Sequence, residues 1–509
     1  MSRFKSAFWG SVSSQVFMII YMLLAMGTTP LILKYLNKEE YGLSTVIFQI
    51  IGYLSMFDFG LGSAVGRYLA ATRGDDEEAQ MAMNRVISTS FFSYGLLGVV
   101  VCLIGIGFSP FVPAFFQMDA RLSNVAINIV FTMSIFMGLD FPIRVFYSIF
   151  HAHQRQVLGN FTGFVVGILG LILPVVFLYF GYGLWSFAYS IIGCAIFSVT
   201  ITFFLIRKYY PKLRIKRSYF DKSLVTQLFG FGFFLFLNAI AVQIIFQTDR
   251  FYIGSLVSLS AVTVYYITAK LPEISRNLVF KITDNVYPAM VEIVAKEGDN
   301  KFKLIHHKLL LITVSCIMVA FWMIFILDYW FLKLWVGENF FAGTEILVLT
   351  LIIMVQHSVL HVSFVCLNGA GIVKGLSVVS LVEAVLNLGL SIWLGKLYGI
   401  KGILIATIIA GALTTVWYTP YSLVKFTKIR LVDYLIKPVL FPIIIISCFG
   451  AILYWGSNQV LQTMEVNWLS FIGLGLVLGV LFGLFIWTVL LKKEFIEYVP
   501  VRFKKYLYV

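Results

Sequence analysis

The residues of this 509-residue chain that could do chemistry are charged side chains inside long apolar segments. Segment 261–289 is the richest of these, and its polar residues fall within about 120° of one helix face at 100° per residue. They are Lys270, Glu273, Asn277, Lys281, Asp284 and Asn285, with Arg276 at the edge of the stripe. A charge at the centre of a bilayer costs at least about 2.5 kcal/mol, so such residues normally face a bundle interior or a wet cavity. The stripe therefore predicts a helix that lines a hydrated cavity of net positive character. Salt bridges, including local pairs of Lys270 with Glu273 and Lys281 with Asp284, are the alternative.

Segment 42–69 carries Asp58 and, near its end, Arg67. A long Arg side chain can extend from a helix end to the membrane surface, which is the alternative for Arg67. Asp58 is too short to do so and needs a partner. Small residues surround it, and they permit close helix packing.

Two further acids lie in apolar segments. Asp140 stands four residues before Arg144, a spacing that suits a cavity lining or a local ion pair. Glu383 shares a helix face with Asn387. These acids also need partners at membrane depth.

Neutral polar residues complete the set. His357 and His361 are four residues apart, and this spacing could hold a metal ion, but no Asp, Glu or Cys nearby completes a site. We therefore expect no metal and no cofactor. A role at a wet face and ordinary buried hydrogen bonding both remain open for the two histidines. Asn238 and Gln243 add polar groups on segment 224–247.

The elements that hold these residues follow from composition. The chain is 60% hydrophobic and only 12% charged, whereas a soluble domain carries about 25% charged residues. This excludes an ordinary soluble enzyme, and the high hydrophobicity excludes disorder. A spanning helix needs about 20 mostly apolar residues. About fourteen such segments can be counted, with twelve as the alternative: 8–33, 42–69, 86–109, 122–147, 157–180, 183–206, 224–247, 261–289, 305–331, 344–367, 375–397, 402–424, 435–455 and 468–491. Pro272 and Pro288 interrupt the eighth.

The basic residues indicate the orientation. The termini and every second loop hold about 28 Lys and Arg residues, against about 7 in the alternate loops. Positive charge gathers on the cytoplasmic side, so both termini are expected there, and the net charge of +14 needs no nucleic acid. Weak internal similarity at an offset of 218 residues, such as Gly193 with Gly411, suggests two repeats of six helices. The predicted division is a six-helix lobe 1–206, a basic linker 207–223, a second lobe 224–424, and two extra helices with a basic tail, 425–509.

No enzyme signature is present. The sequence contains no GxxxxGK[ST], HExxH or GxSxG motif, and its outer loops are short. We therefore expect a transporter rather than an enzyme.

Several motifs resemble a known family. They are Leu36–Leu43, Phe57–Gly62 continuing to Arg67–Ala70, Asp249–Gly254 with Val264–Tyr266 and Pro288, Leu334–Gly337, and Asn368–Gly371. With the helix count, they make the chain similar to the polysaccharide-transport branch of the multidrug/oligosaccharidyl-lipid/polysaccharide flippase superfamily, which includes O-antigen flippases. The similarity covers nearly the whole length, and none of these motifs names a substrate.

The resemblance implies an all-α membrane protein with two six-helix lobes in a V around a central cavity and two C-terminal helices outside. It implies movement of a polyprenyl-diphosphate-linked oligosaccharide from the cytoplasmic to the outer leaflet of a bacterial-type inner membrane. The driving force would be an H⁺ or Na⁺ gradient, and a polysaccharide polymerase and chain-length regulator are the expected partners. The residues fit these roles. The residues expected to bind the diphosphate are Arg67, Arg144, Lys270, Arg276 and Asn277. The residues expected to couple the cation are Asp58, Asp140, Glu273 and Glu383. The further polar residues expected in the cavity are His357, His361, Asn238 and Gln243.

Three other functions are alternatives to this hypothesis. A cation-coupled multidrug exporter of the same superfamily would favour acids and aromatic residues over bases in its cavity. A membrane polymerase or ligase of polysaccharide synthesis would need a large outer catalytic loop. A flippase for the peptidoglycan precursor satisfies the same physical requirements as the leading hypothesis.

Overall fold

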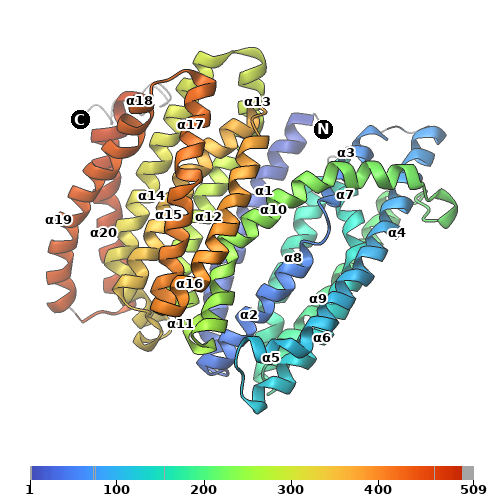
Figure 1. Ribbon diagram of the computed structural model, residues 1–509, viewed down its shortest axis with the longest axis horizontal. Helices are drawn as coiled ribbons and strands as arrows, with labels where there is room; N and C mark the ends of the chain where they lie inside the picture. The colour runs from blue at the N-terminus through green and yellow to red at the C-terminus, as the bar shows by residue number, and fades with distance from the viewer. Residues whose placement is uncertain (1–2, 73, 75, 154, 464, 496–509) are drawn as a thin grey trace. The chain divides into compact units, whose positions relative to one another are not determined.

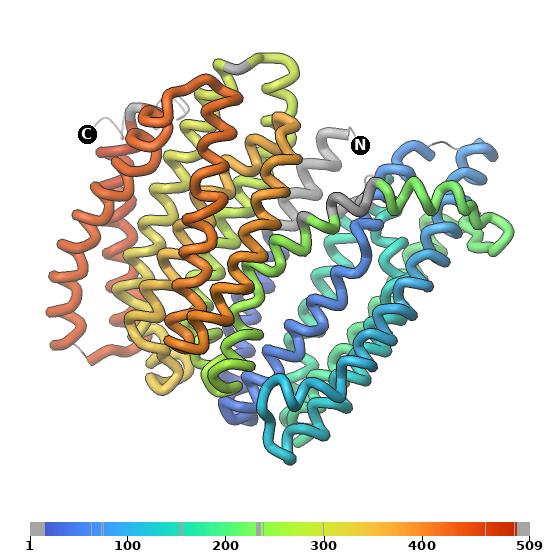
Figure 2. The backbone as a smooth tube through the Cα atoms, in the orientation of Figure 1, coloured from blue at the N-terminus to red at the C-terminus, as the bar shows by residue number. Residues whose placement is uncertain are grey.

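The computed structural model describes residues 3–495 except 73, 75, 154 and 464, and these residues are almost entirely helical (Figure 1). No strand occurs among them. The predicted all-α class is confirmed. Long rods joined by short turns make up the chain path (Figure 2).

The chain divides into two compact units, residues 1–263 and 264–509. The helices of the first unit are α1 Arg3–Leu33, α2 Lys38–Ser55, α3 Leu61–Ala71, α4 Glu77–Phe108, η1 Ser109–Phe111, α5 Val112–Phe115, α6 Ala120–Asp140, η2 Phe141–Ile143, α7 Arg144–Ala152, α8 Gln156–Tyr179, α9 Trp185–Tyr209, η3 Arg217–Tyr219 and α10 Lys222–Leu256. Helix α11, Leu259–Thr268, crosses the boundary. Helix α10 packs against α2, α3 and α4 of the first unit. A functional division at the basic linker stays a prediction.

The second unit contains α12 Lys270–Asp284, α13 Tyr287–Lys296, α14 Asp299–Trp335, η4 Glu338–Phe340, α15 Thr344–Gly369, α16 Lys374–Leu413, α17 Thr415–Thr427, α18 Leu431–Leu435, η5 Ile436–Leu440, α19 Phe441–Thr463, α20 Trp468–Ile486, η6 Trp487–Leu491 and α21 Lys492–Phe495. Its main core lies where α14 meets α15, with Leu310, Val314, Val362 and Cys366 fully buried.

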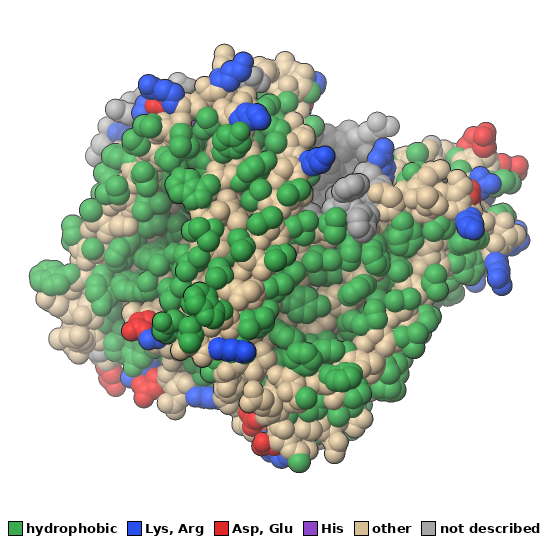
Figure 3. Space-filling model, in the orientation of Figure 1, with side chains coloured by type: hydrophobic (Ala, Val, Ile, Leu, Met, Phe, Trp, Pro, Cys, Tyr) green, Lys and Arg blue, Asp and Glu red, His purple; other side chains and the backbone are tan. Residues whose placement is uncertain are grey.

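Ten helical stretches among the described residues are long and apolar enough to cross a membrane. One of them, Lys374–Thr427, contains two of the predicted segments, because the backbone turns at Gly399 with a φ of 60°. Predicted segments 42–69, 224–247 and 261–289 correspond to α2–α3, α10 and α11–α12, which are outside the ten. The chain is thus a polytopic membrane protein, and fourteen crossings remain a prediction. Hydrophobic side chains cover the helices on the face in Figure 3, and charged side chains gather toward the helix ends.

Two of the predicted helices are broken. Segment 42–69 was expected to be continuous, but α2 ends at Ser55 and α3 starts at Leu61. Between them Phe59 and Gly60 have left-handed φ values of 52° and 68°, a conformation that glycine adopts without steric cost. The eighth segment is broken as the prolines predict, since Pro288 starts α13 and Pro272 lies in the first turn of α12.

The start of α2 is tied to α11. The Thr263 hydroxyl donates a hydrogen bond of 2.5 Å to the Lys38 carbonyl, across 225 residues of sequence. Gly42 lies so close to the Leu259 carbonyl that a β-carbon at position 42 would overlap it. Glycine is therefore required where these two helices meet.

Candidate substrate and cation sites

In the first unit, Asp58 lies in the break between α2 and α3. Its Oδ1 accepts a hydrogen bond of 2.9 Å from the Gly60 amide, so the half-buried carboxylate stabilises the turn in which it lies. A β-carbon at Gly62 would lie 3.5 Å from the Tyr94 hydroxyl and 4.0 Å from Asp58 Oδ2. The absence of a side chain at Gly62 therefore brings both groups to the same side of α3. The buried Tyr94 hydroxyl has no hydrogen-bond partner among the described residues.

Arg144, the first residue of α7, is the base of this group. Its Nε lies 3.2 Å from Asp140 Oδ2, and its Nη1 donates a hydrogen bond of 2.9 Å to the Ser55 carbonyl at the end of α2. It also attracts Asp58 electrostatically. A base suits this position, because the last carbonyls of a helix carry partial negative charge. The local ion pair that the spacing of Asp140 and Arg144 allowed is present, and the structure adds Asp58 to it.

The other predicted residues of the first unit belong to α3 and α10. Arg67 is exposed on α3. Gln243 of α10 lies against α2, with its Nε2 3.6 Å from the position of a β-carbon on Gly52. The side chain of Asn238 is outside the described residues.

In the second unit, the polar residues of α12 point in several directions. Lys270 Nζ donates a hydrogen bond of 2.7 Å to the Tyr266 hydroxyl and lies 4.6 Å from the centre of its ring. Arg276 is only 9% exposed, Glu273 is half-buried and Asn277 is exposed. Asp284 contacts His361, and among the described residues no ion pair joins it to Lys281. Helix α12 therefore has an exposed polar side and a buried side, and Arg276 is buried.

Helix α15 supplies the partners of α12. His361 Nε2 lies 2.9 Å from Asp284 Oδ1, and its ring stacks on Phe280 with centroids 3.8 Å apart. His357 is buried one turn earlier, and Arg276 and His361 both act on it electrostatically. The two histidines of α15 therefore lie alongside Arg276, Phe280 and Asp284, which are spaced one turn apart on α12. Among the described residues no three His, Cys, Asp or Glu side chains are placed to hold a metal ion.

A second polar group of this unit surrounds Glu383, which is 3% exposed. Its Oε2 accepts a hydrogen bond of 3.3 Å from Thr414, and Thr415 is a second hydroxyl partner. The break between α16 and α17 at Thr414 brings these hydroxyls to the acid. A β-carbon at Gly411 would lie 3.3 Å from Glu383 Oε1 and would collide with the amide of Gln356. Gly411 is thus the point where α15 and the two halves of α16 approach closely.

The same group continues one turn along α16. Asn387 Nδ2 donates a hydrogen bond of 2.8 Å to Thr407 Oγ1, while Asn387 Oδ1 has no hydrogen-bond partner among the described residues. The buried Gln356 Nε2 also lacks one within the part of the chain that the structure describes. Oxygen atoms and one carboxylate gathered in this way can hold a proton or a small cation.

Sequence reasoning missed Thr407 and Thr414, which belong to these sites, and a buried acid elsewhere, Asp328. Thr407 and Thr414 gave no local signal, because a threonine in an apolar helix usually bonds its own backbone. Asp328 of α14 is fully buried, and neither carboxylate oxygen has a hydrogen-bond partner among the described residues. An acid inside an apolar segment was a sufficient signal for Asp328, but it lies close to the end of predicted segment 305–331.

Comparisons with known proteins agree with this architecture. Residues 9–294 match the family described as "Polysaccharide biosynthesis protein". An uncharacterized membrane protein of Bacillus subtilis, EpsK, is 23% identical over 96% of both chains. A Yersinia pseudotuberculosis protein named for O-antigen export is 23% identical over 81% of this chain and 93% of its own.

Solved structures share the fold. A lipid II flippase, MurJ, in an inward closed conformation aligns over 94% of this chain and 99% of its own, with 14% identity and a TM-score of 0.70. An inward-facing multidrug resistance MATE transporter aligns over 82% of this chain and 99% of its own, with 15% identity and a TM-score of 0.64. At these identities the likeness establishes the fold alone.

Proposed function

Because the chain belongs to the polysaccharide biosynthesis protein family, within the polysaccharide-transport branch of the flippase superfamily, we propose that it moves a polyprenyl-diphosphate-linked oligosaccharide across the membrane. Transport runs from the cytoplasmic to the outer leaflet of the inner membrane and supplies cell-surface polysaccharide synthesis. Both termini are cytoplasmic, and a polymerase and a chain-length regulator act on the product. Membership in this branch makes the protein a transporter, not an enzyme.

The observation that carries the proposed substrate is the placement of bases on α12. Arg276 is buried and Lys270 is half-buried, on a helix that packs against the apolar α14 and α15. A guanidinium binds two oxygens of a diphosphate at once, so a base at this depth suits a diphosphate-linked substrate. Asn277, which is exposed on the same helix, is a donor for sugar hydroxyls.

The acids divide the remaining work. Among the described residues, the hydrogen-bond partners of Glu383 are neutral, which supports a role in binding the coupling H⁺ or Na⁺. Asp58, Asp140 and Glu273 are further cation-coupling residues in this proposal. Arg67 and Arg144 attract the diphosphate from the first unit. The two lobes would alternate access to the substrate by rocking.

The test is restoration of surface polysaccharide in a strain that lacks the gene, at equal membrane levels of each variant. Arg276→Gln is expected to abolish transport and Arg276→Lys to retain part of it, because lysine keeps the charge without the paired donors. Arg121→Gln is the matched control, since Arg121 is exposed and paired with Glu40. Normal transport in Arg67→Gln, Arg144→Gln, Lys270→Gln and Arg276→Gln alike would refute the diphosphate assignment. Drug resistance on overexpression, without any effect on polysaccharide, would favour a multidrug exporter.

A further inference from the structure

The segment that joins α9 to α10 is fixed along α4. We call residues 212–221 the strap. Its backbone bonds to a polar face on the first turns of α4, formed by Gln80, Asn84, Ser88 and Thr89. The Arg214 amide donates to Asn84 Oδ1 at 3.0 Å, the Lys216 amide to Ser88 Oγ at 3.2 Å and the Asp221 amide to Thr89 Oγ1 at 3.0 Å. A connection expected to be a basic linker is therefore held in one conformation by side chains of a spanning helix.

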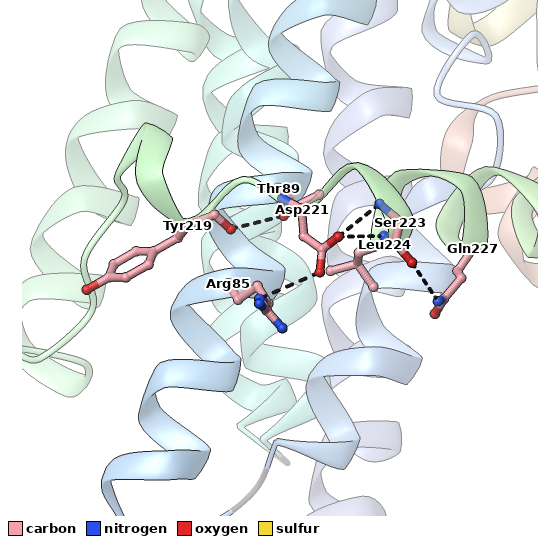
Figure 4. Close-up of polar contacts among 7 residues, drawn as sticks. All are labelled: Arg85, Thr89, Tyr219, Asp221, Ser223, Leu224 and Gln227. Carbon is pink, nitrogen blue, oxygen red and sulfur yellow. Dashed lines mark hydrogen bonds and ion pairs between the residues drawn. The ribbon is translucent and has the colours of Figure 1, made fainter.

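Asp221 fixes the end of the strap (Figure 4). Its Oδ1 accepts hydrogen bonds from the Ser223 and Leu224 amides and so caps α10, while its Oδ2 lies 3.6 Å from Arg85 Nε of α4. Figure 4 shows Asp221 between the two helices, pointing to both. One carboxylate thus links the strap, α4 and the start of α10.

The strap presents its bases outward. Lys212, Arg214 and Lys216 are exposed, whereas Leu213 and Ile215 between them are half-buried. This alternation is typical of an extended backbone, in which successive side chains point to opposite sides. Arg217 follows and is also exposed. Within the residues that the structure describes, Lys212, Arg214 and Arg217 form no ion pair. The result is a row of cations whose backbone is already ordered.

The depth of the strap follows from the length of α4. Helix α4 has 32 residues, or about 48 Å at 1.5 Å per residue, against a hydrocarbon core of about 30 Å. Part of this helix must extend beyond the hydrocarbon. Exposed Phe92 and Phe220 contact each other one turn beyond Thr89, with ring centroids 6.4 Å apart, and exposed aromatic rings are typical of the membrane interface. The bases of the strap therefore lie at the level of the lipid headgroups.

We propose that the strap is a binding site for the phosphate headgroup of an anionic phospholipid, phosphatidylglycerol in the first instance, at the leaflet on the side of the basic loops. The row of unpaired cations supplies the charge complementarity. Because hydrogen bonds to α4 fix the backbone, the cations lose little freedom on binding, unlike those of a flexible basic tail. A bound lipid would stabilise the strap and, through Asp221, the junction of α4 and α10. Lipid binding at the strap does not depend on which substrate the protein transports.

The experiment measures the unfolding temperature of the full-length protein in neutral detergent while phosphatidylglycerol or phosphatidylcholine is added. Only phosphatidylglycerol is expected to raise it, with saturation. The variant Lys212→Gln/Arg214→Gln/Arg217→Gln should raise the half-saturating concentration by on the order of a hundredfold, since each base near an anionic surface contributes about fivefold. The control Lys374→Gln/Lys425→Gln/Lys437→Gln removes the same charge from exposed bases of the second unit and should respond like the wild type.

A second variant tests whether the fixed backbone of the strap contributes to lipid binding in addition to its charge. Ser88→Ala removes bonds to the strap and keeps every base, so the half-saturating concentration should rise several-fold while the unliganded protein still folds. Equal stabilisation by the two lipids, or equal responses of the strap variant and the control, would overturn the proposal. Equal stabilisation by inorganic phosphate would show a site for free phosphate and would overturn the lipid assignment.

Discussion

Asp58 in the first unit and Glu383 in the second are both acids at breaks between helices, but their neighbours differ in charge. Asp58 lies beside Arg144, which also pairs with Asp140 and the end of α2. Glu383 is surrounded by the hydroxyls of Thr414 and Thr415 and the amide of Gln356. In a medium of low dielectric constant, a compensated carboxylate stays charged and holds structure, whereas an uncompensated one gains most from taking up a proton or cation. Glu383 is therefore the principal coupling acid of the proposal, and Asp58 has a structural role beside its smaller part in coupling.

The largest expected effect is on transport by Glu383→Gln. Glutamine keeps the size and the hydrogen bonds but cannot exchange a cation, so polysaccharide export should fall by about a hundredfold or more, equivalent to about 3 kcal/mol. The thermal unfolding of the purified variant should stay close to that of the wild type. Glu345→Gln, which changes an exposed acid paired with Lys401, is the control and should transport normally. Full export by Glu383→Gln would refute the coupling role that distinguishes Glu383 from Asp58.

The next effect is on the stability of Arg144→Ala. This change leaves Asp58, Asp140 and the Ser55 carbonyl without their base and should lower the free energy of unfolding by about 2 kcal/mol, a value reduced from that of a fully buried pair because both side chains are partly exposed. Denaturant titration in detergent measures it. The double variant Asp140→Asn/Arg144→Gln should recover part of the loss. An unchanged free energy of unfolding in Arg144→Ala would show that Arg144 does not hold this turn, whatever its effect on export.

A smaller effect is expected for Asn387→Ala. The change removes one buried hydrogen bond to Thr407 and should cost about 1 kcal/mol of stability. If Asn387 Oδ1 also faces the coupling cation, export should show a weaker dependence on the Na⁺ or H⁺ gradient than in the wild type. The matched variant Asn277→Ala, at an exposed position of α12, should leave the gradient dependence unchanged. An identical gradient dependence in the wild type and Asn387→Ala would exclude this residue from the cation site.

The smallest effect on stability is expected for Glu292→Gln, which changes an acid exposed to water. The hydrogen bond from Lys296, at 2.6 Å, lowers the pKa of the exposed Glu292 on α13. A lowered pKa in the folded state means that the stabilisation is present above the ordinary glutamate value of about 4.3 and is lost as the pH falls through the lowered one. Because both side chains are exposed, Glu292→Gln should unfold within error of the wild type at pH 7. A clear destabilisation at pH 7 that disappears in acid would show that charge pairing on the surface contributes more than this comparison allows.

Much of this architecture follows from the sequence. Apolar segment lengths predicted most helices, because a bilayer demands about 20 apolar residues per crossing, and Pro272 and Pro288 predicted the interruptions of the eighth segment. The spacing of Asp140 and Arg144 predicted their pair, since both lie within one turn and a short 3₁₀ segment preserves it.

The remaining features depend on contacts between distant segments. His361 meets Asp284 across 77 residues, and only the register of α15 against α12 selects that partner over Lys281. The break at Phe59 and Gly60 also has no unique local pattern, because glycine-rich stretches occur in continuous membrane helices as well. A turn at Thr414 brings the threonines to Glu383, and the local sequence around Thr414 does not predict this turn.

The contact of α2 with α11 has a consequence for synthesis. Lys38 and Gly42 leave the ribosome more than 200 residues before Thr263 and Leu259, their partners. At 5–20 residues per second, that interval is roughly 10–40 s. During this interval the surface of α2 at Gly42 lacks its contact with α11. The first unit can therefore complete its packing only when translation is about half complete.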